Sequence, residues 1–342
     1  MATTFVTRRS TAAAAFQLAG ALALAGCANP TDGGTTEVAA TSGDKTRINI
    51  SPDQNRVTTG KVDSIAAEVP EKIRRRGTLE IVDSSGSAAP LTFHATDNRT
   101  VIGVEPDIAY LVADVLGLKP HLNTVSWENI FVGLDSGKYD VGLSNITVTE
   151  ERKEKYDFAT YREDNLAFEA KKGSGLKIDG PEDVAGRTVA VGSGTNQEKL
   201  LIEWSKENEK AGRKPVDIKY YQNDSDTYLA LQSGRIDLYL GPNPTAAYHA
   251  ATTGKTEVVG TYSGAGAGLQ GLIAATTKKD NGLAKPLADA LDHVIENGTY
   301  AKVLKRWGLS GEAVRKSQIN PPGLPKTGSQ PAAPQSPSAA PR

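Results

Sequence analysis

Arg152 lies in a stretch of residues suited to binding a carboxylate. Its guanidinium is a rigid planar fork that can donate two parallel hydrogen bonds to a carboxylate. Asn145, Thr147 and Thr149 precede it at alternating positions, so on an extended segment both hydroxyls face the same side. Arg152 also fits the solvated charged face of a helix over residues 150–155, and its neighbours alone do not decide between the two readings.

A second candidate anion site is the run Gly-Ser-Gly-Thr-Asn at residues 192–196. It lies between an expected strand at 188–191 and an expected helix at 197–207. Free backbone N–H groups and the positive end of a helix dipole favour a negative group at such a junction. A plain tight turn between strand and helix is the alternative.

Strand patterns alternate with helical patterns on both sides of these groups. In the first half we expect strands at 78–82, 121–125 and 139–144, with helices at 107–116 and 129–134 between them. In the second half we expect strands at 188–191, 216–220 and 236–240, with helices at 197–207 and 225–231. This order predicts an α/β fold with mostly parallel strands.

The two halves share a local signature. Residues 134–143 and 231–240, which are 97 positions apart, both carry Leu, Ser-Gly, a basic residue and then an apolar-acidic-apolar pattern. In each, a glycine able to take the left-handed conformation would end a helix and a strand would follow at once. Chance similarity of a common turn is the alternative to two similarly built lobes.

Composition and motifs exclude several classes. The 342 residues have a formal charge of −1 and 6% aromatic residues, which does not suit a nucleic-acid-binding protein. Cys27 is the only cysteine, so an intramolecular disulfide and a multi-cysteine metal site are impossible, and the four histidines are dispersed. Because no nucleophile-elbow or zinc-protease motif is present, we expect no enzyme, no metal and no cofactor.

The two ends predict an anchored protein. Residues 1–26 read as a signal peptide that ends in Leu-Ala-Gly before Cys27, a pattern resembling a bacterial lipobox. An ordinary secretory signal with an incidental cysteine is the alternative, and Arg8-Arg9 partly resembles a twin-arginine signal. We expect a flexible tether over 27–71 and a disordered, proline-rich tail over 313–342.

Two long blocks carry a family resemblance. Residues 127–141 and 146–158 resemble the family 3 solute-binding proteins of amino-acid ABC transporters. Shorter matches at 77–79, 103–108, 191–195 and 298–308 support these two blocks. The resemblance as a whole covers residues 72–310. It implies the type II periplasmic binding fold, an α/β fold of two lobes joined by two hinge strands, with the ligand clamped between the lobes.

The resemblance also implies domain limits and residue roles. Lobe 1 would comprise 72–166 and 270–312, lobe 2 would comprise 167–269, and the hinges would lie near 165–171 and 268–275. Residues matching the family pattern would bind the ligand: Arg152 would grip its α-carboxylate, Thr195 and Asn196 would contact the same group, and Trp127 would pack on it, with Asn145 and Thr147 nearby.

Two positions depart from the family pattern. Pro242 stands where an aspartate usually pairs with the ligand's α-ammonium, and Ala88 stands where an aromatic is usual. The first loop offers hydroxyls such as Ser85 instead. Asp164, Asn243 or Asp83 could replace the aspartate, or the ligand could be a carboxylate without an α-amine, or a bulkier amino-acid derivative.

Together these features predict a lipid-anchored, extracytoplasmic, monomeric binding protein. It would capture an amino acid or related small carboxylate by hinge closure and present it to ABC permease subunits. A ligand sensor for a signalling partner, or a dehydratase or lyase on the same fold, are the alternatives.

Overall fold

The computed structural model describes residues 35–39, 45–84, 88–221 and 223–326. The signal peptide, Cys27 and Ser85 lie outside this part of the chain. Within it, no helix combines the length and apolar character needed to cross a membrane.

The first half forms the elements expected from its hydrophobic pattern. Strand β3 (Thr78–Ser84) pairs in parallel with β6 (Lys119–Val125) and with the short β7 (Val141–Gly142). Helices α3 (Val104–Leu116) and α4 (Trp127–Asp135) connect them.

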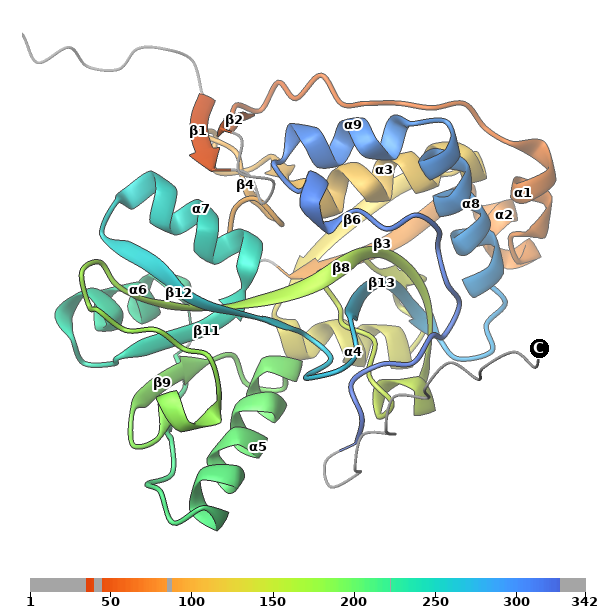
Figure 1. Cartoon of the computed structure of the whole chain (residues 1–342). Coiled ribbons are helices and arrows are strands. Elements are labelled where there is room, and N and C mark those ends of the chain that lie inside the picture. The colour runs from red at the N-terminus through yellow and green to blue at the C-terminus, as the bar shows by residue number, and fades with distance from the viewer. Residues whose placement is uncertain (1–34, 40–44, 85–87, 222, 327–342) are drawn as a thin grey trace, which may run out of the picture. The chain divides into compact units, whose positions relative to one another are not determined.

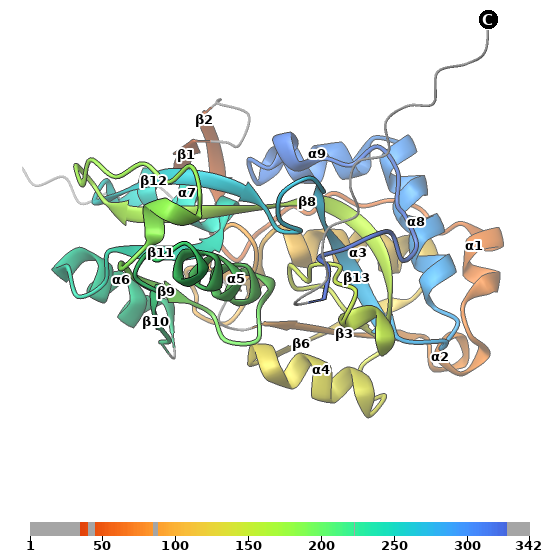
Figure 2. The ribbon, with the colours of Figure 1, turned by 60° about the horizontal axis from the view of Figure 1, so that its bottom comes forward.

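Helices cover both faces of this part of the sheet. Figures 1 and 2 show α4 on one side of β3 and β6, with α3 on the other beside α8 (Ala284–Glu296) and α9 (Thr299–Arg306). The small elements of this half are β1 (Thr35–Ala39), β2 (Lys45–Asn49), α1 (Asp63–Glu68), α2 (Glu71–Arg76), β4 (Phe93–His94) and β5 (Val101–Ile102).

The second half repeats this arrangement. Strand β9 (Thr188–Val191) pairs in parallel with β10 (Asp217–Lys219) and β11 (Leu238–Pro242). Helices α5 (Asn196–Lys210) and α6 (Asp224–Ser233) connect these strands, and α7 (Asn243–Thr253) follows β11. Three-residue or four-residue 3-10 turns occur at Arg152–Glu154, Pro181–Val184 and Ser310–Glu312.

One long strand joins the two halves into a nine-stranded mixed sheet. Strand β8 (Tyr156–Lys171) pairs antiparallel with β13 (Gly271–Lys278) along its first part. Along its last part it pairs antiparallel with β11 and with β12 (Thr256–Ser263). The strand therefore passes from one set of parallel strands to the other, and the sheet is less parallel than the sequence predicts.

Separate hydrophobic cores surround the two sets of parallel strands. Alternate residues of β3 point to opposite faces, so Leu79 and Ile81 pack against α3, α8 and α9 whereas Val82 packs with α4. In the second half, Phe168 of β8 packs with Val189, Leu201 and Leu238 of the neighbouring elements. Strand β8 contributes to both cores, with Tyr161 in the first and Phe168 in the second.

The repeated signature forms the same turn twice. Gly137 and Gly234 both have left-handed backbone conformations, with φ of 71° and 76°, just after α4 and α6. Lys138 N donates to Gly133 O at 3.0 Å, and Arg235 N donates to Ala230 O at 2.9 Å. The interpretation of the two halves as repeats is therefore supported at the level of hydrogen bonds.

The prediction of a flexible tether over 27–71 is wrong for residues 48–71. Ile48 and Val69 are buried in the first core, and Arg56 forms an ion pair with the buried carboxylate of Asp107. Helices α1 and α2 also lie in this segment. Composition misled the prediction because a few well-separated apolar residues cannot fold alone but can join an existing core.

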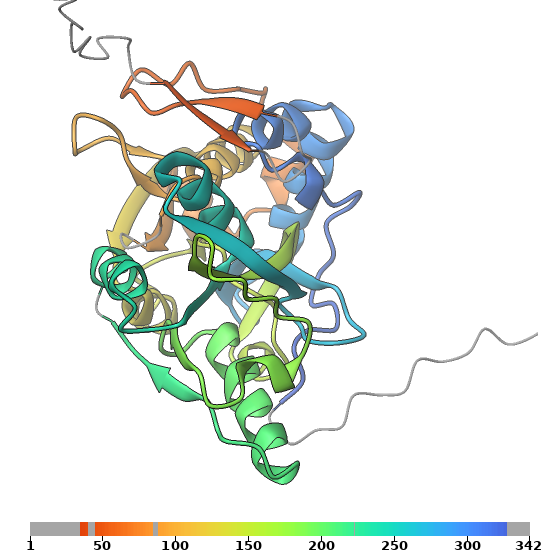
Figure 3. The same ribbon diagram turned by 60° about the vertical axis from the view of Figure 1, so that its left-hand side comes forward.

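The prediction of a disordered tail from residue 313 is wrong up to residue 326. In Figure 3 the dark blue C-terminal segment runs beside β8. Ile319 pairs with Ala159 and Leu324 pairs with Thr149, each through strand-like bridges. Proline favours an extended backbone, and an extended segment can still pair with a free strand edge through its remaining N–H and C=O groups. The later prolines lie outside the described residues.

Candidate functional site

A cavity of about 420 Å³ lies between residues of the two cores. The first half of the chain contributes Ser84, Ala88, Trp127 and Asn145 among the lining residues. The second half contributes most of the 192–196 turn, the two tyrosines that follow β10, and the end of β11. A site with walls from both halves can change its shape when the halves move relative to each other.

Arg152 lies beside this cavity, against the Trp127 ring. Its guanidinium carbon is 5.3 Å from the centre of the Trp127 ring and 5.2 Å from that of Phe131. Nη1 donates to Thr147 O at 2.9 Å and Nη2 donates to Gly194 O at 3.3 Å. Burial lowers the pKa of Arg152 to about 10, so the side chain remains charged at neutral pH. The cation of the first half thus already touches the glycine turn of the second half.

Side chains of α5 form hydrogen bonds with the backbone of the 192–196 turn. Thr195 caps α5: its Oγ1 accepts from Glu198 N at 3.2 Å and donates to Gly192 O at 2.7 Å. Gly194 N donates to Glu198 Oε2 at 2.7 Å, and the Tyr220 hydroxyl donates to Glu198 Oε1 at 2.6 Å. The Glu198 carboxylate therefore holds an N–H group that an incoming carboxylate could use.

A buried polar cluster connects the halves beneath the cavity. Thr147 Oγ1 donates to Asp164 Oδ2 at 2.8 Å, and Asn196 Nδ2 donates to the same oxygen at 3.1 Å and to Gly264 O at 3.0 Å. Burial raises the pKa of Asp164, and the hydrogen bond from Thr147 opposes that rise. In this state the Thr147 hydroxyl binds Asp164, not a ligand.

The remaining predicted residues divide into three groups. Asn145, with φ of 52°, lines the cavity and accepts a hydrogen bond from Arg162. Trp127, Thr195 and Asn196 also line it, together with the two departures from the family pattern, Ala88 and Pro242. Asn243 begins α7 and does not line the cavity, and Ser85 lies outside the described residues.

Sequence reasoning missed the part of the cavity that is formed by α6, β11 and the segment before α6. Tyr220, Tyr221, Asp224 and Tyr239 all line it. The signal was weak because these residues are spread over about twenty positions and match no motif. Burial raises the pKa of Asp224 to about 6, and a hydrogen bond from the Tyr239 hydroxyl opposes that rise.

Comparisons with known proteins agree on a class. The family model described as bacterial extracellular solute-binding proteins, family 3, matches residues 80–310. The L-cystine-binding protein TcyJ of Escherichia coli strain K12 is 32% identical over 237 residues, covering 69% of this chain and 84% of that protein. The arginine-binding protein ArgT of Corynebacterium glutamicum is 29% identical over 261 residues, covering 76% of this chain and 83% of that protein.

Solved structures agree on the fold. An ancestral arginine-binding protein bound to arginine has a TM-score of 0.59 and 29% identity, covering 68% of this chain and 98% of that one. An ancestral amino-acid-binding protein described as a precursor of cyclohexadienyl dehydratase has a TM-score of 0.58 and 28% identity, covering 69% and 97%. The predicted type II periplasmic binding fold, with two α/β lobes joined by two hinge strands, is confirmed.

Proposed function

Because this chain belongs to the bacterial extracellular solute-binding proteins of family 3, we propose that it captures one amino acid by closure of its two lobes and delivers it to an ABC permease. The observation that carries the proposal is the cavity lined by residues of both halves, with Arg152 of one half bonded to Gly194 of the other. Ligand contacts made by both lobes stabilise the closed state more than the open one.

The lobe and hinge limits form part of this proposal. We assign 72–166 and 270–312 to lobe 1, and 167–269 to lobe 2. This division is supported by β8, which pairs with β13 up to Asp164 and with β12 from Asn165 onward. A small change in backbone angles between these two residues would move the second core relative to the first.

We propose that the ligand's carboxylate binds at the end of the cavity near Arg152. The guanidinium would exchange its bond to Gly194 O for bonds to the carboxylate, since a charged acceptor binds arginine more strongly than a carbonyl does. Gly194 N and the Thr195 cap would add donors once the Glu198 carboxylate turns away. Trp127 would cover the ligand from the lobe 1 side.

Anchoring and location also belong to the proposal. Lipidation of Cys27 would hold the monomeric protein at the extracytoplasmic face of the membrane, close to the permease. The resemblance of residues 24–27 to a lipobox is the support for this step.

The test is a calorimetric and thermal-shift screen of the full chain carrying Cys27→Ser. Binding to the folded state alone raises Tm by mass action. We expect a shift with at least one proteinogenic amino acid and a binding stoichiometry of one. No shift with any amino acid, or shifts only with amine-free carboxylates, would overturn the proposal. Recovery of a chemically altered ligand would instead indicate an enzyme. One structural neighbour is described as a precursor of an enzyme, cyclohexadienyl dehydratase.

A further inference from the structure

Three tyrosines and one aspartate from lobe 2 line one part of the cavity. Tyr220 and Tyr221 follow β10, Asp224 is the first residue of α6, and Tyr239 lies in β11. Burial and the neighbouring Asp224 carboxylate raise the pKa of the Tyr239 hydroxyl. The four side chains thus come from three neighbouring elements of one lobe.

Gly241 creates the room for this arrangement. A Cβ atom on Gly241 would lie 3.1 Å from Tyr239 Cζ and 3.3 Å from its hydroxyl oxygen. The Tyr239 ring therefore lies over the Gly241 backbone, next to Pro242, and its hydroxyl reaches Asp224. Asp224 and Tyr239 thus form neighbouring parts of the cavity wall contributed by lobe 2.

Apart from Arg152, which lies beside one end of the cavity, the charged side chains of its wall are acidic. Among the described residues that line the cavity, the charged ones are Glu128 and Asp224. No described lysine or arginine forms an ion pair with Asp224, while the nearby His249 is paired with Glu169 at 2.5 Å. A half-buried carboxylate without a cation costs free energy, and a cationic ligand group would offset that cost.

We propose, building on the function proposed above, that Asp224 and Tyr239 bind a cationic group at the far end of the ligand, and that the ligand is a basic amino acid. Its carboxylate would lie at Arg152 and its side-chain cation at Asp224. Tyr221 and Tyr239 line the same part of the cavity as Asp224, and aromatic rings attract a guanidinium or ammonium group.

This charge pattern separates two ligands bound by relatives. L-Cystine carries a second carboxylate beside its far ammonium, and that carboxylate would face Asp224 without a cationic partner in the described cavity wall. L-Arginine ends in a guanidinium alone, which the Asp224 carboxylate favours. The wall therefore favours arginine or lysine although a cystine-binding protein is among the more similar relatives.

The test compares L-arginine with its neutral isostere L-citrulline by calorimetry, on the full chain carrying Cys27→Ser. We expect arginine to bind roughly 10- to 100-fold more tightly than citrulline, as a charge-assisted bond implies. Asp224→Asn should weaken arginine binding by a similar factor and change citrulline binding by less than about threefold. Asp226→Asn, on the same helix but outside the cavity lining, is the matched control and should change neither.

The outcomes separate this inference from the function on which it rests. If the unmodified cavity binds no amino acid, the proposed function fails. If it binds arginine and Asp224→Asn binds arginine equally well, the function stands and the role of Asp224 is overturned. If cystine binds more tightly than arginine, the ligand class is overturned.

Tyr239→Phe removes only the hydroxyl and provides a second variant in case Asp224→Asn does not fold. Its affinity for arginine should fall several-fold. Unchanged affinity would contradict a joint role of Asp224 and Tyr239.

The dependence of binding on pH provides an independent readout. Since the pKa of Asp224 is raised to about 6, arginine affinity should fall as pH drops through that value and the carboxylate takes up a proton. The groups facing Asp224 are Tyr239 of β11, Glu169 of β8, and His249 of α7, whose ring stacks on Tyr228 of α6. Loss of the pH dependence in Asp224→Asn would identify Asp224 as the responsible group.

Discussion

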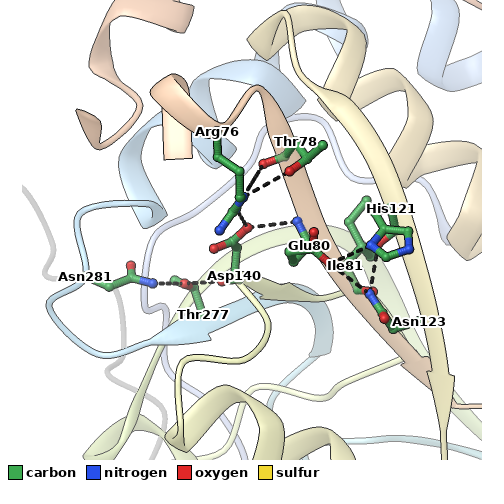
Figure 4. Close-up of polar contacts among 9 residues, drawn as sticks. All are labelled: Arg76, Thr78, Glu80, Ile81, His121, Asn123, Asp140, Thr277 and Asn281. Atoms are coloured by element: carbon green, nitrogen blue, oxygen red, sulfur yellow. Dashed lines mark hydrogen bonds and ion pairs between the residues drawn. The ribbon is translucent and has the colours of Figure 1, made fainter. Parts of the chain in front are cut away.

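Asp140 and Asp237, 97 positions apart, make the same hydrogen bonds in the two lobes. Asp140 Oδ2 accepts from Glu80 N at 2.8 Å, as Asp237 Oδ2 accepts from Thr188 N at 2.8 Å. Each aspartate N–H also donates to the carbonyl of the same partner, at 2.8 Å in both cases. Figure 4 shows the first of these, where Arg76 adds an ion pair to Asp140. In each lobe, the aspartate just before β7 or β11 thus forms the same pair of hydrogen bonds to the neighbouring parallel strand, β3 or β9.

The first prediction concerns the difference between these two aspartates. Asp140→Ala should lower the free energy of unfolding by about 2 kcal/mol, because it removes a buried acceptor from Glu80 N and the partner of Arg76. Asp237→Ala should cost about 0.5–1 kcal/mol, since its partner N–H is exposed to water. Urea denaturation of both variants measures this difference, and equal losses would contradict it.

The second prediction concerns Arg152. Arg152→Ala should weaken binding of the cognate amino acid by about 100-fold or more while the protein stays folded, because the ligand carboxylate loses a two-point charged partner. Calorimetry measures the affinity and circular dichroism checks the fold. Lys155→Ala, three residues later and exposed, is the control. Unchanged affinity in Arg152→Ala would remove the carboxylate from this end of the cavity.

The third prediction concerns competition at the glycine turn. The Glu198 carboxylate accepts a hydrogen bond from Gly194 N, and its negative charge repels the carboxylate of an incoming ligand. Glu198→Gln should therefore raise ligand affinity several-fold, to at most about 10-fold. The same calorimetric titration measures this effect. A loss of affinity would instead mean that Glu198 holds the turn in the shape the ligand needs.

The fourth prediction concerns the C-terminal segment. Ending the chain at Glu312 should lower the free energy of unfolding by roughly 2–4 kcal/mol, because the bonds to Val148, Glu150 and Thr160 are lost. Ending it at Lys326 should leave stability unchanged. Urea denaturation compares the two truncations, and an identical midpoint for both would show that residues 313–326 contribute nothing.

The fifth prediction concerns the anchor. Cys27→Ser should move the protein from the membrane fraction to the soluble fraction, since a serine offers no thiol for lipidation. Fractionation of cells followed by immunoblotting measures the partition. Continued membrane association after a high-salt wash would show that Cys27 is not the anchor.

Hydrophobic periodicity predicted the regular elements well and the joining strand poorly. The two β-α-β-α-β runs appear within a few residues of their expected limits because each element packs one apolar face. The family resemblance predicted a hinge strand near residues 165–171 of β8, whereas the hydrophobic pattern predicted no strand over 156–164. The charged residues Arg162 and Glu169 interrupt the apolar pattern of this strand. Both are buried, with Arg162 paired to Glu105 and Glu312. Such pairing depends on residues far away in the sequence.

The candidate site shows the same division. Arg152 and Trp127 could be proposed as ligand-binding residues because they lie in the two long blocks that resemble the family, and Thr195 because it lies in a shorter match. Asp224 and Tyr239 were not, because only the folding of α6 beside β11 brings them together. The hydrogen bonds of Thr147 and Glu198 likewise follow from three-dimensional contacts that spacing does not show.

The path of the C-terminal segment makes it a natural place for a fluorescent label. Leu324 pairs with Thr149, three residues before Arg152, and a Cβ on Gly266 would lie 3.9 Å from Leu324 and 3.3 Å from Leu200 of α5. The segment therefore lies within reach of both lobes where they approach each other. An environment-sensitive dye attached at Lys326, which is exposed, would change its emission as the lobes move and would read out ligand concentration without altering the cavity.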